Sequence, residues 1–169
     1  MSEYYTPQQI AHFIAEGNLD IKTTNKIIQE IFQKEYPFIH PKYQNNQQQF
    51  QKETETYTNF ITFKKEFENE LKKEKTNDYI NQYKEFLKIQ PNFFITTRLT
   101  LLYIKKYRII KLRTLLKLYG YKRRKSNIIL KFHDNIIFYH LKTYHKDEEK
   151  DISQFELDEW ITFKLQQNE

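Results

Sequence analysis

The chain has 169 residues, of which 38% are hydrophobic and 17% aromatic, and its net charge is +6. This apolar content is enough for a folded core, which excludes a wholly disordered protein, and the length suits one domain or one domain with an arm. The absence of cysteine excludes a disulfide framework and a zinc ribbon, and residues 1–20 lack the basic start and apolar core of a secretory signal.

Two short amphipathic helices are predicted within residues 1–36. Thr6 can cap the first helix, Gln9 occupies the return position of a capping box, and Gly17 ends the helix. The second helix is expected from about residue 22 to residue 35. Because this pair is too small to bury its own apolar faces, we expect it to dock on the rest of the chain or on a protein partner through Ile27, Ile31 and Phe32.

A polar tract at residues 37–51 is predicted to be a linker that leads into a helical domain over residues 52–169. A long helix is predicted from about residue 54 to residue 75, since apolar residues recur there at spacings of three and four: Phe60, Phe63, Phe67 and Leu71. The next predicted helix ends before Pro91. Its short connection makes the two helices antiparallel neighbours.

Positive charge is concentrated in the middle of the sequence. No acidic residue lies between Glu85 and Asp134, and those 48 positions hold 13 of the 28 cations, including all five arginines. The rest of the chain carries 15 cations against 22 acidic residues. A lysine-rich codon bias would not remove acidic residues from one window. The clustered charge therefore indicates a surface for nucleic acid, and burial of this block against carboxylates of the chain or of a protein partner is the alternative.

The basic block is predicted to contain a helix-turn-helix over residues 98–133. A helix capped by Thr96 or Thr97, with a periodic apolar run that continues or restarts it, reaches Gly120. The basic turn YKRRK follows, and Ser126 caps a short second helix, whose N-terminal residues would lie near base edges in a helix-turn-helix. The predicted nucleic-acid-binding residues are Arg113, Lys117, Tyr121, Lys122, Arg123, Arg124, Lys125, Ser126, Asn127 and Lys131.

The C-terminal part is expected to add one short strand and one helix. Residues 135–144 are apolar, aromatic and β-branched, which predicts a strand, with continuation of the preceding helix as the alternative. Ser153 to Glu156 match a capping box and predict an acidic helix over residues 153–167 that folds back on the basic block or binds a partner through Trp160 and Ile161. The predicted fold class is mainly α, a helical bundle with a basic helix-turn-helix-like segment.

The sequence contains no pattern that indicates catalysis. Two glycines cannot form a glycine-rich phosphate loop, and a nucleophile elbow and a catalytic cysteine are both absent. His140 and His145 lack the spacing of a helical metal-binding pair. The apolar stretch from Leu99 to Leu118 contains six cations, so no membrane-spanning helix is expected. We therefore predict a protein that is not an enzyme, binds no metal or cofactor and does not enter a membrane.

The segment from Gly120 to Phe132 resembles a divergent helix-turn-helix of homeobox-like type, although it lacks the Trp-Phe-x-Asn-x-Arg signature of a homeodomain. With its size and basic block, the chain is similar to the small homeobox-like accessory subunits of a protist DNA N6-adenine methyltransferase complex. This resemblance implies a non-catalytic nuclear subunit that helps a methyltransferase core hold duplex DNA, with S-adenosylmethionine bound elsewhere in the complex. The alternatives are a structural subunit of a large protein assembly and an RNA-binding ribonucleoprotein component, resident in the cytoplasm or an organelle.

Overall fold

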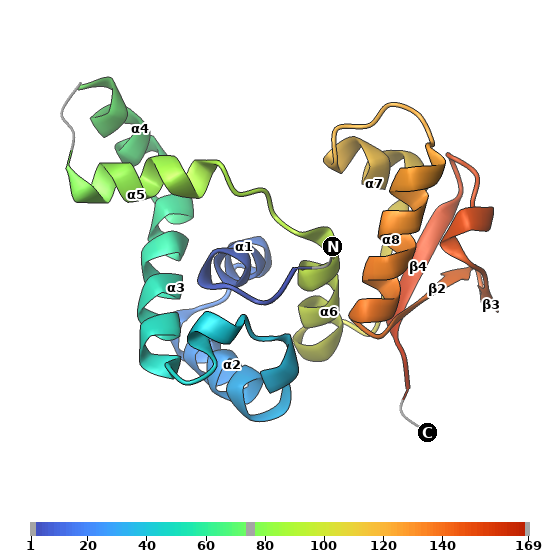
Figure 1. Ribbon diagram of the computed structural model, residues 1–169, viewed down its shortest axis with the longest axis horizontal. Helices are drawn as coiled ribbons and strands as arrows, with labels where there is room; N and C mark the ends of the chain where they lie inside the picture. Colours follow the sequence, from blue (N-terminus) through green and yellow to red (C-terminus); the bar gives the residue numbers. More distant parts are fainter. Residues whose placement is uncertain (1–2, 74–76, 168–169) are drawn as a thin grey trace. The chain divides into compact units, whose positions relative to one another are not determined.

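The computed structural model describes residues 3–73 and 77–167, which form eight α-helices and a four-stranded antiparallel sheet (Figure 1). The mainly helical class predicted from the sequence is confirmed. The chain divides into two compact units, which we treat separately. The first unit comprises residues 4–96, and the second comprises the described residues from Thr97 onward together with Glu3. The division falls within helix α6 (Phe93–Tyr103).

The first unit is helical throughout. In chain order it contains α1 (Pro7–Gly17), α2 (Ile21–Lys34), the short 3₁₀ helices η1 (Tyr36–Phe38) and η2 (Pro41–Tyr43), α3 (Gln47–Thr62), α4 (Lys64–Lys72) and α5 (Asp78–Leu87). Helices α1 and α2 confirm the predicted pair, and the hydroxyl of Thr6 caps α1. The helix ends at Gly17 as expected, but the left-handed residue that closes it is Asn18, with φ 49°.

Helix α1 packs against α3 through its apolar face. Spacings of three and four place Ile10, Phe13 and Ile14 on that face, and all three are buried. The side chain of Gln9 reaches a distant segment of the chain. Its Oε1 accepts a hydrogen bond from the backbone N of Asn92 (2.7 Å), and its Nε2 donates to the carbonyl of Gln90 (3.0 Å). Because a buried amide needs partners for its polar atoms, these bonds fix the segment after α5 onto α1.

The segment predicted to be a linker, residues 37–51, is folded. Ile39 is fully buried and pairs with Tyr5 in an isolated parallel β-bridge. The glutamine-rich stretch forms the first turn of α3, where Asn46 Oδ1 accepts a hydrogen bond from the backbone N of Gln49 (3.2 Å). Composition misled this prediction because glutamine is a good helix former as well as a common linker residue. Helices α1 and α2 are therefore joined to α3 in one unit.

The helix predicted over residues 54–75 consists of two helices that meet at Phe63, and its last two positions lie outside the described residues. The hydroxyls of four threonines in α3 donate to the carbonyls four residues earlier at 2.7 to 3.2 Å. Such bonds compete with the helix backbone and favour bending, which fits an end at Thr62. As a result Phe63 is 47% exposed, although its spacing had placed it on the apolar face.

An aromatic cluster holds α3, α4 and α5 together. Phe60, Tyr83 and Phe86 are buried, with the ring centroid of Phe60 5.4 Å from that of Tyr83 and 5.8 Å from that of Phe86. Phe67 of α4 meets Phe60 in a T-shaped contact at 4.9 Å. The hydroxyl of Tyr83 donates to Glu68 (3.1 Å). Each aromatic pair of this kind contributes about 0.5–1.5 kcal/mol beyond its buried area.

The second unit combines a helix pair with the sheet. After α6 it contains β1 (Arg108–Lys111), α7 (Leu112–Leu118), α8 (Ser126–Phe138), β2 (Leu141–His145), β3 (Glu148–Glu149), η3 (Ile152–Gln154) and β4 (Trp160–Leu165). The strand order is β1-β4-β2-β3, and all neighbours are antiparallel. Strand β4, the last in the sequence, therefore lies between β1 and β2.

The core of the second unit lies between its helices and one face of the sheet. Ile161 and Phe163 lie two residues apart on β4, and both are fully buried. Leu141 on β2 is almost fully buried. Helices α7 and α8 supply further buried apolar residues, which recur at helical spacing: Leu112, Leu115 and Leu116 on α7, and Ile128, Ile129, Phe132 and Ile136 on α8. The alternate residues of β4 and β2 consequently face away from the core.

Strand β1 was missed because its partner is far away in the sequence. The periodic run from Ile109 to Tyr119 predicted helix, and only its later part, α7, is helical. Ile109 pairs with Thr162 of β4, more than 50 residues later. The local spacing of apolar residues cannot reveal such a pairing, although two adjacent β-branched residues fit a strand.

The acidic helix predicted over residues 153–167 is not formed. The capping-box sequence makes the single 3₁₀ turn η3, in which Asp151 rather than Ser153 is the capping residue. The following residues form β4, whose outward and inward side chains alternate from Trp160 to Lys164. The same residues therefore fit two patterns, the alternation of a strand and the helical spacing on which the prediction was based.

Residues 135–144 contain both predicted alternatives, the end of the preceding helix and then a strand. Helix α8 continues to Phe138, four to five residues beyond its predicted end near residue 133. His140 then takes a left-handed conformation (φ 53°), and β2 begins at Leu141, which confirms a short β element in this segment.

We predict that Phe60→Ala lowers the free energy of unfolding of the chain by about 3–5 kcal/mol, because it removes a buried ring from the centre of the aromatic cluster. Phe63→Ala is the matched control, since that ring is half exposed, and its cost should stay below about 1 kcal/mol. Urea denaturation followed by circular dichroism measures both. Equal losses would contradict the division of the predicted long helix at Phe63.

We also expect acid to destabilise the first unit through His12. Its ring stacks on Phe86 (5.1 Å between centroids), and its Nε2 is buried with no hydrogen-bond partner among the described residues. Burial lowers the pKa of His12 below 6.5. The unfolded chain therefore binds a proton that the folded chain does not, so the free energy of unfolding falls as pH drops from 6.5 towards the lowered pKa. Denaturation at several pH values should show this slope, and His12→Phe should reduce it.

Candidate nucleic-acid interface

Helix α7, the turn of residues 119–125 and helix α8 occupy the segment predicted to be a helix-turn-helix. Gly120 has φ 83°, a conformation that favours glycine, and it closes α7. The N–H of Gly120 donates to the carbonyl of Lys117 and that of Tyr121 to the carbonyl of Leu116, each at 3.0 Å, which is a Schellman motif. The ring of Tyr119 contacts Phe132 of α8 at 5.3 Å. The chain is thus reversed by a fixed turn whose two helices are packed together.

A pocket of about 380 Å³ opens beside this turn. It is lined by Arg113, Lys117, Gly120, Tyr121 and Lys122. Within the described part of the chain, no carboxylate lies at ion-pair distance from either lysine. The side chains that line the pocket carry two ammonium groups without ion pairs, a guanidinium and a phenol, which can donate to a phosphate group, while carbon atoms form most of the pocket wall. Four of the predicted binding residues line this one opening.

Arg113 is held by a carboxylate of its own chain. Its Nε donates to Oδ1 of Asp158 (2.8 Å) and its Nη2 to Oδ2 (3.0 Å), a bidentate pair. The hydrogen bond from Arg113 lowers the pKa of Asp158 below its usual value, so the pair is formed at neutral pH. Both side chains are more than half exposed. Solvent and salt therefore weaken the pair, and an anion in the pocket can compete with Asp158 for the guanidinium.

The four consecutive cations of the turn have two different roles. Arg124 donates from Nη1 to the backbone carbonyl of Phe155 (2.6 Å), which ties the turn to the segment before β4. Lys122, Arg123 and Lys125 are exposed, and among the described residues none of them has an ion-pair partner. Three cations of the turn are therefore open to an external anion, while one supports the fold.

Helix α8 begins one residue earlier than a serine cap at Ser126 would require. Ser126 is its first helical residue, and the capping position is held by Lys125, whose side chain makes no capping hydrogen bond. The exposed face of the helix carries Asn127, Leu130, Lys131 and then Asp134 at spacings of three and four. Leu130 is 62% exposed. This face is polar with one apolar residue, and it is less basic than the turn.

Other cations of the basic block serve the fold. Arg98 is buried and donates from Nη1 to the carbonyl of Tyr139 (2.7 Å) at the end of α8. Arg108 donates from Nη1 to the hydroxyl of Thr97 (3.3 Å). Lys88, in the first unit, pairs with Glu85 (2.9 Å). The charge block of the sequence is therefore divided: some of its cations serve the fold, several open ones lie at the turn and α8, and Lys105 and Lys106 are exposed after α6.

Most of the residues predicted to bind protein partners are used by the chain itself. Ile27 and Ile31 are buried within the first unit, Ile161 is fully buried under the sheet, and Phe32 is partly covered in a T-shaped contact with Phe50. Sequence periodicity identified apolar faces but could not show whether the chain or a partner covers them. Trp160 alone of the five presents a largely exposed side chain.

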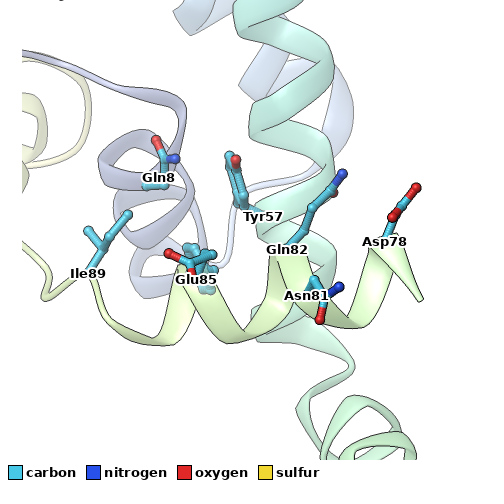
Figure 2. Close-up of a pocket in the computed structure, with 8 residues that line it drawn as sticks. Gln8, Tyr57, Asp78, Asn81, Gln82, Glu85 and Ile89 are labelled. Carbon is cyan, nitrogen blue, oxygen red and sulfur yellow. The ribbon is translucent and has the colours of Figure 1, made fainter. Parts of the chain in front are cut away.

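A second pocket, of about 400 Å³, lies in the first unit along α5 (Figure 2). Amides, acids and aromatic or apolar groups line it: Gln8, Tyr57, Asp78, Asn81, Gln82, Glu85, Phe86 and Ile89. Figure 2 shows the two carboxylates on different turns of α5, directed away from one another. The described residues contain no group of three or more His, Cys, Asp or Glu side chains that could hold a metal. With acids and no cation in its lining, this pocket does not suit a polyanion.

We predict that Asp158→Asn increases retention of the chain on heparin, because it frees the Arg113 guanidinium beside the basic pocket. The unfolding midpoint should hardly change, since the ion pair is exposed. Glu156→Gln is a suitable control, because it removes one nearby exposed charge that has no ion-pair partner among the described residues. If both variants shift the elution salt equally, net charge rather than release of Arg113 is responsible.

No known family model, curated protein or solved structure matches this chain in the comparisons made. None of the helices in the described ranges combines the length and apolar content that crossing a bilayer requires. The function of the basic turn is therefore argued from its own geometry and charge.

Proposed function

We propose that this chain binds duplex DNA through α7, the basic turn and α8. The pocket beside the turn carries the proposal, because Arg113, Lys117 and Lys122 surround one opening with Tyr121. A concave surface lined by charge of one sign attracts a polyanion. Backbone phosphates supply most of the affinity in sequence-independent DNA binding, so a cluster of this kind is the first requirement of the function.

The order of elements in the second unit supports a duplex as the ligand. Strand β1 is followed by two helices joined by a tight turn, by the β2–β3 hairpin and, after η3, by β4, which returns between β1 and β2. In helix-turn-helix proteins the first helix crosses the backbone and the N-terminal residues of the second meet base edges. Helix α8 holds the second position here, and the phosphate-suited pocket lies at α7 and the turn.

The exposed side chains of α8 suit contacts in the major groove. The amide of Asn127 can pair with an adenine edge, Lys131 can donate to guanine, and Leu130 can contact a thymine methyl group. The open N–H groups of the first turn of α8 add donors for a phosphate. We place electrostatic affinity at the turn and base contacts on α8.

The wider role predicted from the sequence fits this surface. A subunit that helps an adenine methyltransferase core hold DNA needs phosphate contacts and no catalytic site of its own, so we keep the accessory role and nuclear residence as parts of the proposal. Competition between duplex DNA and structured RNA of equal charge separates DNA binding from the ribonucleoprotein alternative.

The direct test replaces Lys122, Arg123 and Lys125 together by glutamine and leaves Arg124, which supports the fold. Each lost phosphate contact should reduce the slope of log affinity against log salt by about one, so the slope should fall by up to about three. Fluorescence anisotropy with a labelled duplex at several salt concentrations measures this change.

The matched control replaces Lys64, Lys65 and Lys72 of α4 by glutamine, which removes the same charge from exposed positions of the first unit. This variant should keep the salt slope of the wild type. Duplex binding that survives the turn variant unchanged would reject the proposed surface, and equal losses in both variants would show that only the net charge matters.

A further inference from the structure

We propose a second binding site, for single-stranded nucleic acid, on the outer face of the sheet in the second unit. This outer sheet face is defined by Lys111, Lys142, Tyr144, Trp160, Thr162 and Lys164, and the register adds Ile109 opposite Thr162 and Glu149 opposite Tyr144. The site is separate from the turn and α8, and its ligand is an unpaired strand whose bases stack on the two aromatic rings.

Strand register places these side chains together. Ile161 and Phe163 of β4 point into the core, so Trp160, Thr162 and Lys164 point the opposite way. Residues directly opposite each other in the register share a face, which adds Lys111 opposite Trp160, Tyr144 opposite Thr162 and Lys142 opposite Lys164. Trp160 is 55% exposed, and the side chains on the neighbouring strands remain partly accessible.

The two aromatic residues lie on adjacent strands of one face, and each ring has an ammonium group beside it. Tyr144 lies diagonally from Trp160 in the register, a separation of about 7–8 Å between backbone positions. The Nζ of Lys111 is 5.1 Å from the ring centroid of Trp160, and the Nζ of Lys164 is 4.9 Å from that of Tyr144. A base that stacks on either ring can displace the lysine, which then reaches the adjoining phosphate.

The charge of this face is unbalanced in a way that favours an anion. Lys142 and Lys164 are directly opposite each other, an arrangement that is unfavourable for like charges. Glu149 lies 3.3 Å from Lys142 and offsets one of them. Among the described residues, neither Lys111 nor Lys164 has a carboxylate at ion-pair distance. Phosphates bound along the face would relieve the remaining repulsion.

The chemistry selects a single strand over a duplex. In a duplex the faces of the bases are covered by their neighbours, whereas an unpaired strand offers them for stacking on aromatic side chains. Exposed aromatics beside cations are the combination by which proteins hold single strands with little sequence preference. The carboxylates of an acidic protein segment could pair with the lysines but would not stack on the two rings. Binding of such a segment is therefore one outcome of the test.

Trp160 provides the readout, because it is the only tryptophan in the chain. Its fluorescence is followed while the full chain is titrated with a thymidine oligonucleotide of about 15 residues, a length within the range that single-strand sites cover. Saturable quenching is expected. A duplex of the same length, heparin and polyglutamate should bind without comparable quenching, because none of them offers an accessible base face.

Two variants assign the binding to this face. Trp160→Ala should weaken binding of a labelled single strand by about 5- to 150-fold, the range expected for loss of one stacked base. Replacing Lys111 and Lys164 together by glutamine keeps both rings and should lower the single-strand salt slope by up to about 1.4. Circular dichroism checks that each variant is folded, and the double variant tests the site even if Trp160→Ala unfolds.

The outcomes also separate this proposal from the duplex site. The variant of Lys122, Arg123 and Lys125 should lose duplex binding and keep quenching by the single strand, and the outer-face variants should do the reverse. Quenching by polyglutamate as strong as that by the oligonucleotide would identify an acidic protein surface as the ligand and overturn the proposal. Loss of quenching in the turn variant, or no quenching in the wild type, would overturn it as well.

Discussion

The position of β4 between β1 and β2 is the constraint on which the second unit depends. Without this strand neither β1 nor β2 has a neighbour on that side, and the core loses Ile161 and Phe163. The segment before β4 also completes α7. The carbonyls of Glu159 and Leu157 accept hydrogen bonds from the N–H groups of Leu112 and Arg113 (3.2 and 2.8 Å), which would otherwise lack partners at a helix start.

The same segment positions the basic turn. Its Phe155 carbonyl holds Arg124 of the turn, and its Asp158 carboxylate holds Arg113 of the pocket, so one stretch of chain anchors both arginines. The two hydrogen-bond partners differ in how easily a ligand can replace them. A backbone carbonyl is a permanent partner for Arg124, whereas an exposed carboxylate can be replaced by another anion. The fold therefore orients the Arg113 guanidinium and leaves it able to bind an external anion.

Sequence reasoning succeeded where the determining contacts were local. The Thr6 cap, the helix breaks at Gly17 and Gly120 and the apolar faces of α1 and α5 follow from residues within a few positions. It failed where distant residues decide the structure. Ile109 and Trp160 lie in runs with helical spacing. Each is nevertheless in a strand, because β1 and β4 pair with one another. The cationic turn was identified from charge alone, but the division between Arg124 and its neighbours required the fold.

The exposed side chains of the second unit do not favour folding of the chain without a ligand. An exposed tryptophan, two lysines opposite each other on adjacent strands and cations without ion pairs around the turn contribute little to the stability of the free chain beyond the lysine–ring contacts, and like charges at close range oppose it. The core beneath them is largely apolar, and the burial of its side chains offsets this cost. An anionic ligand would reverse the sign of these contributions on both surfaces. Such surfaces are typical of proteins whose stability is completed by binding, since a ligand that binds only the folded state stabilises it.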